Sequence, residues 1–261
     1  MKAAPLPCAS APRSAFKSAA ASLALAFALA VALTAALAFA APGAAFAKSY
    51  ECPQVNLTAQ AQTDGALHVV EQRTFDFDGS FTAVWWTFHN LPSNAEVAVN
   101  SVRMATLDEA GNVASDWAQL NPVSFQVSWR DEGGPDTSAW SFDKVQDTVY
   151  AFFDASDARV VFELDYTVEN GVQAYDDVAE VYWKYVAEDW EVDSANVIAT
   201  IELPVPSGTS VTPGENVRAW GHGPADGTVS VNEDGTVVYR VSQVLSGQYA
   251  EARVVFPVSW L

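Results

Sequence analysis

The chain has 261 residues, of which 50% are hydrophobic, and a formal net charge of −19. This acidity excludes nucleic-acid binding through basic clusters and disfavours contact with anionic lipid headgroups. The length corresponds to one or two domains and is sufficient for a sizeable hydrophobic core.

The first 47 residues have the pattern of a secretory signal peptide. Arg13 and Lys17 precede an apolar run over residues 19–41, and Ala45 and Ala47 supply the small side chains of a peptidase site. We therefore predict a signal peptide over residues 1–47 and an extracytoplasmic location for the rest of the chain. The apolar run is also long enough to span a bilayer, so an uncleaved membrane anchor is the alternative.

The chain after this signal is still more acidic and contains one cysteine. Three basic residues, Lys2, Arg13 and Lys17, lie in the signal with no acidic residue, so 10 basic and 32 acidic residues follow it and give a charge of −22. Cys8 also lies in the signal, which leaves Cys52 without an intramolecular partner. We predict that Cys52 is a free thiol near the start of a strand.

From residue 54 onward the hydrophobic pattern has a period of two, interrupted by frequent turn residues, which is typical of an all-β sandwich. Residues 54–62 and 66–77 alternate on either side of Asp64-Gly65, which predicts a β-hairpin. A second hairpin is predicted for residues 227–241. A helical period is weak and confined to residues 176–186, so we predict an all-β fold of one or two packed, immunoglobulin-like sandwich units.

Two short segments near residue 80 have a simple structural interpretation. Residues 76–79 begin like a calcium-binding loop, but the twelfth position is Thr87 instead of an acid, so we predict a hairpin turn. Trp85 and Trp86 are adjacent, and neighbours on a strand point to opposite faces. One of the two indoles is therefore a candidate for an exposed aromatic side chain, although burial between two sandwich units would also account for it.

An acidic, turn-like run at residues 188–196 is the best candidate for a domain boundary. We predict a first β-sandwich unit over residues 48–190 and a second over residues 191–261. The alternative is one continuous domain in which residues 176–190 form a pair of strands.

The densest cluster of acidic and aromatic residues lies at residues 175–193, and we place the candidate binding site there. Carboxylates beside aromatic rings suit sugar binding, calcium binding or glycosidase chemistry, but pairs of acids are expected by chance in so acidic a chain. The structural interpretation is a strand with Val181 and Trp183 directed inward. The candidate binding residues are Asp176, Asp177, Glu180 and Trp183.

Motifs for catalysis are absent from the sequence. His68, His89 and His222 are isolated, without metal-binding spacing. Neither a GxSxG nor a nucleotide-binding glycine motif occurs. We therefore expect no catalytic residue, no metal site and no cofactor.

The order of several short blocks resembles the DUF2207 family of predicted membrane proteins, whose members are uncharacterised and combine a secretory signal with an extracytoplasmic β-rich region. The resemblance covers residues 49–261. Its blocks are residues 64–75, Phe81, Leu91-Pro92, and residues 164–172, 176–184, 201–204 and 254–257.

This resemblance implies a location and no established activity. Members commonly continue from the β-rich region into transmembrane helices, and this chain stops at Leu261, where such a helix is expected. We therefore expect a fragment, with a complete secreted variant as the alternative.

The sequence supports three functional hypotheses. The first is a non-catalytic extracytoplasmic region of a cell-envelope protein, attached to the membrane through the signal segment or a missing C-terminal helix, that binds an unknown protein or glycan. The second is a secreted, glycan- or calcium-dependent adhesion module. The third is a hydrolase that uses two of the clustered carboxylates.

Overall fold

The structure is a computed structural model that describes residues 48–131, 133–136 and 138–261. The predicted signal peptide lies outside these residues. Nearly all regular structure in the described part is β-strand, which confirms the all-β prediction. Its helices are two 3-10 turns, η1 (Val127–Arg130) and η2 (Val258–Trp260).

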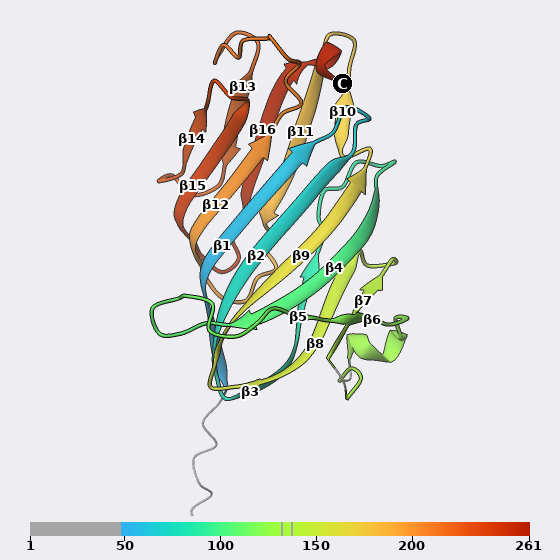
Figure 1. Cartoon of the computed structure of the whole chain (residues 1–261), viewed down its shortest axis with the longest axis vertical. Coiled ribbons are helices and arrows are strands. Elements are labelled where there is room, and N and C mark those ends of the chain that lie inside the picture. The colour runs from blue at the N-terminus through green and yellow to red at the C-terminus, as the bar shows by residue number, and fades with distance from the viewer. Residues whose placement is uncertain (1–47, 132, 137) are drawn as a thin grey trace, which may run out of the picture. The chain divides into compact units, whose positions relative to one another are not determined.

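An eight-stranded sheet, here called the large sheet, forms one layer of the fold (Figure 1). Its order is β14-β15-β12-β1-β2-β9-β4-β5. These strands are β1 (Ser49–Ala61), β2 (Leu67–Asp78), β4 (Glu96–Thr106), β5 (Ala118–Gln119), β9 (Arg159–Glu169), β12 (Ser194–Glu202), β14 (Thr228–Val231) and β15 (Thr236–Val244).

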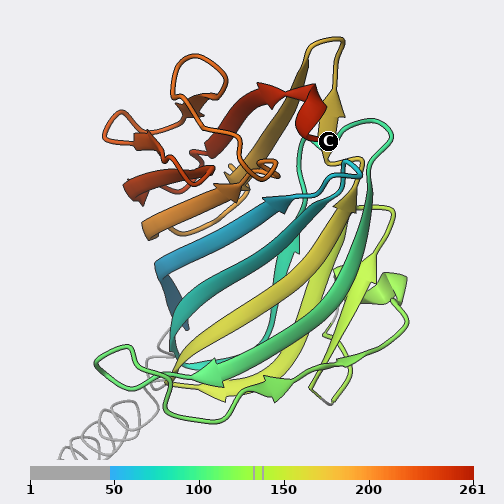
Figure 2. The ribbon, with the colours of Figure 1, turned by 45° about the horizontal axis from the view of Figure 1, so that its top comes forward.

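Two four-stranded sheets lie on one side of the large sheet (Figure 2). The β11 sheet has the order β10-β11-β16-β13, and the β8 sheet has the order β3-β8-β7-β6. The strands of the β11 sheet are β10 (Val172–Ala174), β11 (Val178–Val186), β13 (Arg218–His222) and β16 (Ala250–Pro257). Those of the β8 sheet are β3 (Ser80–Thr87), β6 (Asn121–Pro122), β7 (Ala139–Asp143) and β8 (Thr148–Ser156).

Both predicted hairpins are confirmed. Strands β1 and β2 pair antiparallel across a turn in which Gly65 has a φ of 86°, a conformation that favours glycine. Strands β14 and β15 pair antiparallel across a turn in which Gly235 has a φ of 88°. The Asp-Gly pairs in the sequence therefore mark the tight turns correctly.

The first strand of the described chain lies in the middle of the large sheet because it pairs on both sides. Strand β1 pairs antiparallel with β2 and parallel with β12, with Cys52 opposite Ser194. Strands from residues 48–190 and from residues 191–261 therefore share one sheet, and residues 48–261 form one compact unit. Cys52 is free and buried near the start of β1, as predicted, and burial raises the pKa of its thiol.

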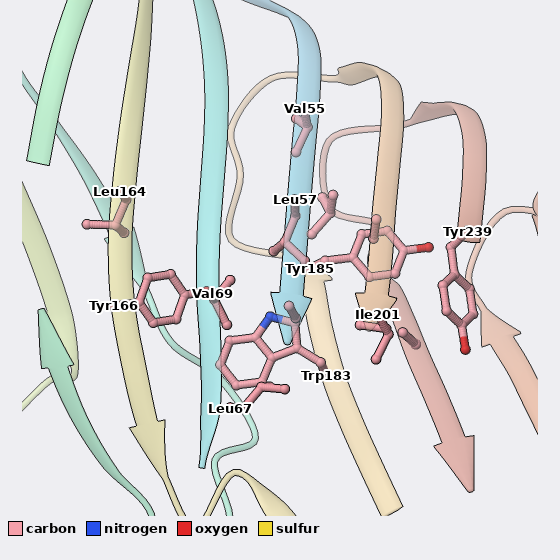
Figure 3. Close-up of a cluster of buried hydrophobic side chains, with 14 of the residues drawn as sticks. Val55, Leu57, Leu67, Val69, Leu164, Tyr166, Trp183, Tyr185, Ile201 and Tyr239 are labelled. Carbon is pink, nitrogen blue, oxygen red and sulfur yellow. The ribbon is translucent and has the colours of Figure 1, made fainter. Parts of the chain in front are cut away.

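The core lies between the large sheet and the two smaller sheets. Tyr166 of β9 contacts Trp183 of β11 with ring centroids 6.1 Å apart, and Phe162 of β9 contacts Phe153 of β8 at 4.8 Å. Figure 3 shows Trp183 among buried side chains of the large sheet, including Leu67, Val69 and Tyr166. One hydrophobic core therefore extends over both smaller sheets.

The segment with the weak helical period is strand β11. Its buried side chains alternate through Ala179, Val181, Trp183 and Tyr185. The inward direction predicted for Val181 and Trp183 is confirmed.

The turn predicted at residues 76–79 carries the chain from one sheet to another. Gly79 has a φ of 91°, a conformation that favours glycine, and a Cβ atom there would lie 2.9 Å from the Cβ of Lys48. Both the backbone conformation and the available space therefore require glycine at this position. Strand β3 then pairs with β8 instead of folding back on β2. The chain does turn here, but the predicted hairpin is wrong, because the turn joins two layers of the sandwich and places β3 at the edge of the second layer.

Candidate functional site

The structure separates the four residues of the predicted binding site. Asp176 and Asp177 are exposed in the turn between β10 and β11. Glu180 lies on the outward side of β11, whereas Trp183 lies on the inward side and is 5% exposed. Trp183 is therefore a core residue that a ligand of the three acids does not reach.

The outer face of the β11 sheet is a network of paired charges. Glu180 accepts a hydrogen bond from Arg253 at 2.9 Å, and the Arg253 guanidinium lies 5.6 Å from the centre of the Trp220 ring. The hydrogen bond to Glu180 raises the pKa of Arg253. The arginine is therefore charged and compensates the Glu180 carboxylate.

A second row of the same face is also satisfied. The Lys184 ammonium lies 2.7 Å from a Glu188 oxygen and 3.3 Å from a Glu251 oxygen. The Tyr182 hydroxyl donates a hydrogen bond to Glu251, which raises the pKa of Tyr182 to about 12. These groups hold one another in place and leave little free charge for a ligand.

The histidines and acids do not assemble a metal site in the part of the chain that the structure describes. His68 pairs with Asp165 at 2.9 Å, and His89 pairs with Asp189 at 3.0 Å. His222 ends strand β13 and is exposed.

A groove of about 470 Å³, here called the aromatic groove, lies on the edge of the second layer. The lining residues of β1 and β2 together with Phe81 of β3 are here called its floor, the other lining residues of β3 one wall, and those of the loop after β11 the opposite wall. Its lining residues are Lys48, Tyr50, Phe75, Phe77, Phe81, Thr82, Ala83, Val84, Trp85, Thr87, Asp189, Trp190 and Glu191.

Stacked rings make up the floor of the aromatic groove. Phe77 stacks on Phe81 with ring centroids 4.6 Å apart, and Phe75 stacks on Phe77 at 5.7 Å. Tyr50 meets Phe81 edge-on at 5.8 Å. Phe75 and Phe77 are themselves buried, so the half-buried rings of Tyr50 and Phe81 supply the accessible part of this floor.

Charged groups lie at the margins of the aromatic groove. The Lys48 ammonium is 4.8 Å from the centre of the Phe81 ring, while Asp189 and Glu191 belong to the opposite wall. Burial, and then the Glu191 carboxylate, raise the pKa of Tyr50. The Tyr50 hydroxyl therefore stays protonated at neutral pH and can donate a hydrogen bond.

Trp190 separates the aromatic groove from a buried polar site. The Arg73 guanidinium lies 4.3 Å from the centre of the Trp190 ring, is paired with Glu71, and donates from Nη2 to the Tyr185 carbonyl at 2.7 Å. Arg73 Nη1 and the Tyr166 hydroxyl have no partner among the described residues, and their side chains line a cavity of about 30 Å³. A polar cavity of that size has room for one water molecule.

Of the groove lining, sequence reasoning had identified only one indole of the Trp85-Trp86 pair, as a candidate for an exposed side chain. The opposite directions predicted for the two indoles are confirmed, since Trp86 is 4% exposed and Trp85 is 54% exposed. Trp85 lines the aromatic groove, and Trp190 belongs to the acidic run that suggested a domain boundary. The pairing of these distant segments has no signal in the sequence.

Comparison with known protein families gives one match. The model described as "Predicted membrane protein (DUF2207) N-terminal domain" matches residues 51–256. No curated protein matches the chain.

Solved structures show only a distant likeness. A crystal structure of "a putative protease from Parabacteroides distasonis ATCC 8503" matches with 9% identity and a TM-score of 0.41, over 78% of this chain and 40% of that one. An M1 zinc metallopeptidase from Deinococcus radiodurans matches with 9% identity and a TM-score of 0.40, over 79% and 42%. The chain thus spans about two fifths of these proteins, and the likeness carries no argument about activity.

Within residues 48–131, 133–136 and 138–261, no helix has the length and apolar character required to cross a membrane.

Proposed function

Because the chain belongs to the DUF2207 family of predicted membrane proteins and matches its N-terminal domain over residues 51–256, we propose that it is a non-catalytic, extracytoplasmic binding region of a membrane-associated cell-envelope protein. The observation that carries the binding role is the aromatic groove. Its volume of about 470 Å³ falls in the range of about 300–1,000 Å³ that is typical of ligand sites.

The composition of the groove supports binding in preference to chemistry. Aromatic rings form the floor, and the acidic side chains stand on one wall, where Asp189 is already paired with His89. Such a surface gains affinity by removing apolar area from water. The extracytoplasmic location is supported by the signal-like pattern of residues 1–47 and by the acidic composition of the rest.

The location is tested by labelling a new cysteine in intact cells. Asp176→Cys places a thiol in an exposed turn, whereas the native Cys52 is buried. A membrane-impermeant maleimide is expected to label Asp176→Cys before lysis and to leave the parent chain unlabelled. Labelling that appears only after lysis would show that the region faces the cytoplasm.

The binding role is tested by photo-crosslinking in the same cells. A benzoylphenylalanine at Thr82, which is exposed at the groove, is expected to form a defined adduct. Val145 is the control position because it is 83% exposed and lies away from the groove lining. Equal adducts at both positions, or none at Thr82, would remove the groove as the binding site.

A second candidate is a glycan-binding module on the outer face of the β11 sheet. Trp220 lies on β13 and is 44% exposed. Tyr175 lies just before β11, the strand that carries Glu180, and is 55% exposed. Exposed rings beside polar groups suit stacking on sugar rings. Retention on a glycan array that is abolished by Trp220→Ala and unaffected by Trp85→Ala would favour this second candidate over the first.

A further inference from the structure

One wall of the aromatic groove is the open edge of a strand. Strand β3 pairs only with β8 and ends the order β3-β8-β7-β6 (Figure 1). The groove is lined by consecutive residues of β3, including Val84 and Trp85, whose side chains point to opposite faces. A cavity that touches both faces of one strand runs along its backbone edge.

The register shows which backbone groups face the groove. Phe88 N–H donates to the Asp147 carbonyl at 2.9 Å, which continues the β3–β8 ladder by one pair. Hydrogen-bonded pairs alternate along an antiparallel ladder. The N–H and C=O groups of Ala83, Trp85 and Thr87 therefore point away from β8, and within the described residues they have no ladder partner.

This edge lacks most of the features that normally protect an exposed strand, although its pairing with β8 has one irregularity, a register shift between Phe81 and Ala83. Charged residues, proline or short length usually prevent an edge from pairing with another chain. Strand β3 has eight residues and contains neither a charged residue nor proline. Among the edge strands that the structure describes, β14 has four residues, β13 carries Arg218, and β6 contains Pro122.

We infer that the aromatic groove accepts an extended segment of a partner protein, which adds to β3 as a further strand of the β8 sheet. Alternate side chains of that segment would face the rings of the floor, and its backbone would pair with the open groups of β3. This inference rests on the proposed function and specifies its partner. Because the six β3 residues that line the groove extend from Phe81 to Thr87, a segment of about seven residues spans it.

The charges of the groove indicate the composition of the segment. The wall opposite β3 carries Asp189 and Glu191, and Glu191 is exposed. The chain as a whole has a net charge of −19. A segment with apolar residues at alternate positions and a lysine or arginine at the end near Glu191 is therefore complementary to the groove.

The test uses capped synthetic peptides and the full-length chain in detergent. The peptide KVTVSVT alternates apolar and polar residues after a lysine, and KTSTVVV has the same composition without the alternation. We expect the quenching of tryptophan fluorescence to show binding of KVTVSVT at least tenfold tighter than binding of KTSTVVV. Binding of the two peptides with equal affinity would overturn strand addition and leave a nonspecific apolar groove.

Backbone methylation gives the sharper discrimination. All valine N–H groups of an extended KVTVSVT point to one edge, and the serine and threonine N–H groups point to the other. One peptide carries N-methyl groups on its valines, and the other carries them on its serine and threonines. One of the two is expected to lose at least tenfold in affinity, while the other keeps most of its affinity. Equal affinity of both methylated peptides would overturn the inference and leave the proposed function standing.

Amide hydrogen exchange and one variant of the protein also test the inference. On binding, amide hydrogen exchange is expected to slow at Ala83, Trp85 and Thr87. Ala83→Pro removes one N–H group that points away from β8 and leaves the hydrogen bonds to β8 in place. This variant is expected to bind KVTVSVT with at least tenfold lower affinity.

Two outcomes separate the inference from the proposed function. If no peptide binds while the benzoylphenylalanine at Thr82 still forms its adduct in cells, the partner is not an extended segment; if both experiments fail, the groove is not a binding site. A dimer in light scattering that KVTVSVT does not dissociate would show that a second copy of this chain occupies the edge, and would also overturn the inference.

Discussion

The two small sheets belong to the same layer but present their polar groups in opposite ways. On the outer face of the β11 sheet, Lys184 and Arg253 are each paired with carboxylates. At the edge of the β8 sheet, strand β3 offers unpaired backbone groups beside a floor of aromatic rings. The difference shows that acids of a dense acidic and aromatic cluster can be paired within the protein. A strand without charged residues, in contrast, can leave backbone N–H and C=O groups available to a partner.

The largest effect that sharpens this comparison is expected from the two adjacent indoles. Trp86→Ala removes a side chain that is 4% exposed in the core and is expected to lower the free energy of unfolding by about 3–5 kcal/mol. Trp85→Ala removes one that is 54% exposed and is expected to change it by less than about 1 kcal/mol while weakening peptide binding. Urea unfolding measures both variants, and similar losses in both would contradict the placement of the two indoles on opposite faces of β3.

The next effect concerns the buried pair behind the groove. Arg73→Met leaves the Glu71 carboxylate buried without its guanidinium partner, so we expect a loss of about 3 kcal/mol or more in urea unfolding. The matched control is the double variant Glu71→Gln with Arg73→Met, which removes both charges and is expected to recover part of the loss. A double variant less stable than Arg73→Met would show that the pair is not the cause.

A smaller, pH-dependent effect is expected from the network on the β11 sheet. The hydrogen bond to Glu251 raises the pKa of Tyr182 to about 12 from its ordinary value of 10. The folded state thus holds this proton more tightly than the unfolded state. The resulting stabilisation is complete below pH 10 and is lost as the pH rises toward 12.

Urea unfolding between pH 9 and about 11.5 tests this dependence. Stability is expected to fall less steeply with pH in Tyr182→Phe than in the parent chain. Parallel curves for the two proteins would show that the Tyr182 hydroxyl does not contribute.

The smallest effect is expected from Glu180, one of the four residues that the sequence suggested as ligand contacts. Glu180→Gln breaks the pair with Arg253, whose side chain is 46% exposed. Exposed ion pairs contribute about 0.2–1 kcal/mol, so the variant is expected to lose no more than that and to bind KVTVSVT normally. A clear loss of peptide affinity would move the binding site to the β11 sheet and reverse the comparison.

Local patterns predicted the strands and turns well. The alternation along residues 66–77 placed Leu67, Val69, Glu71, Arg73 and Phe75 on one face, and all five are buried. The pairing of Glu71 with Arg73 explains how two charged residues share that face with apolar ones. Local periodicity carries this information because neighbouring side chains on a strand alternate between two environments.

The arrangement of distant strands could not be predicted in the same way. The parallel pairing of β1 with β12 and the meeting of β3 with the loop around Trp190 depend on segments that are far apart in the chain. Contacts between such distant segments depend on how the side chains pack in three dimensions. They produce no periodic pattern in the sequence. The acids at residues 176–180 were predicted to bind a ligand because acidic and aromatic residues are dense there. Composition alone does not distinguish a paired carboxylate from a free one.

The central position of β1 has a consequence for how the chain is made. Its partner β12 is synthesised only after residue 193, so the middle of the large sheet stays open on one side until most of the polypeptide has emerged. Contacts of such high sequence separation slow folding. The edge of β1 that pairs with β12 therefore remains open for longer than it would in a sheet built from consecutive hairpins, and chaperones that hold unfolded chains have time to bind it.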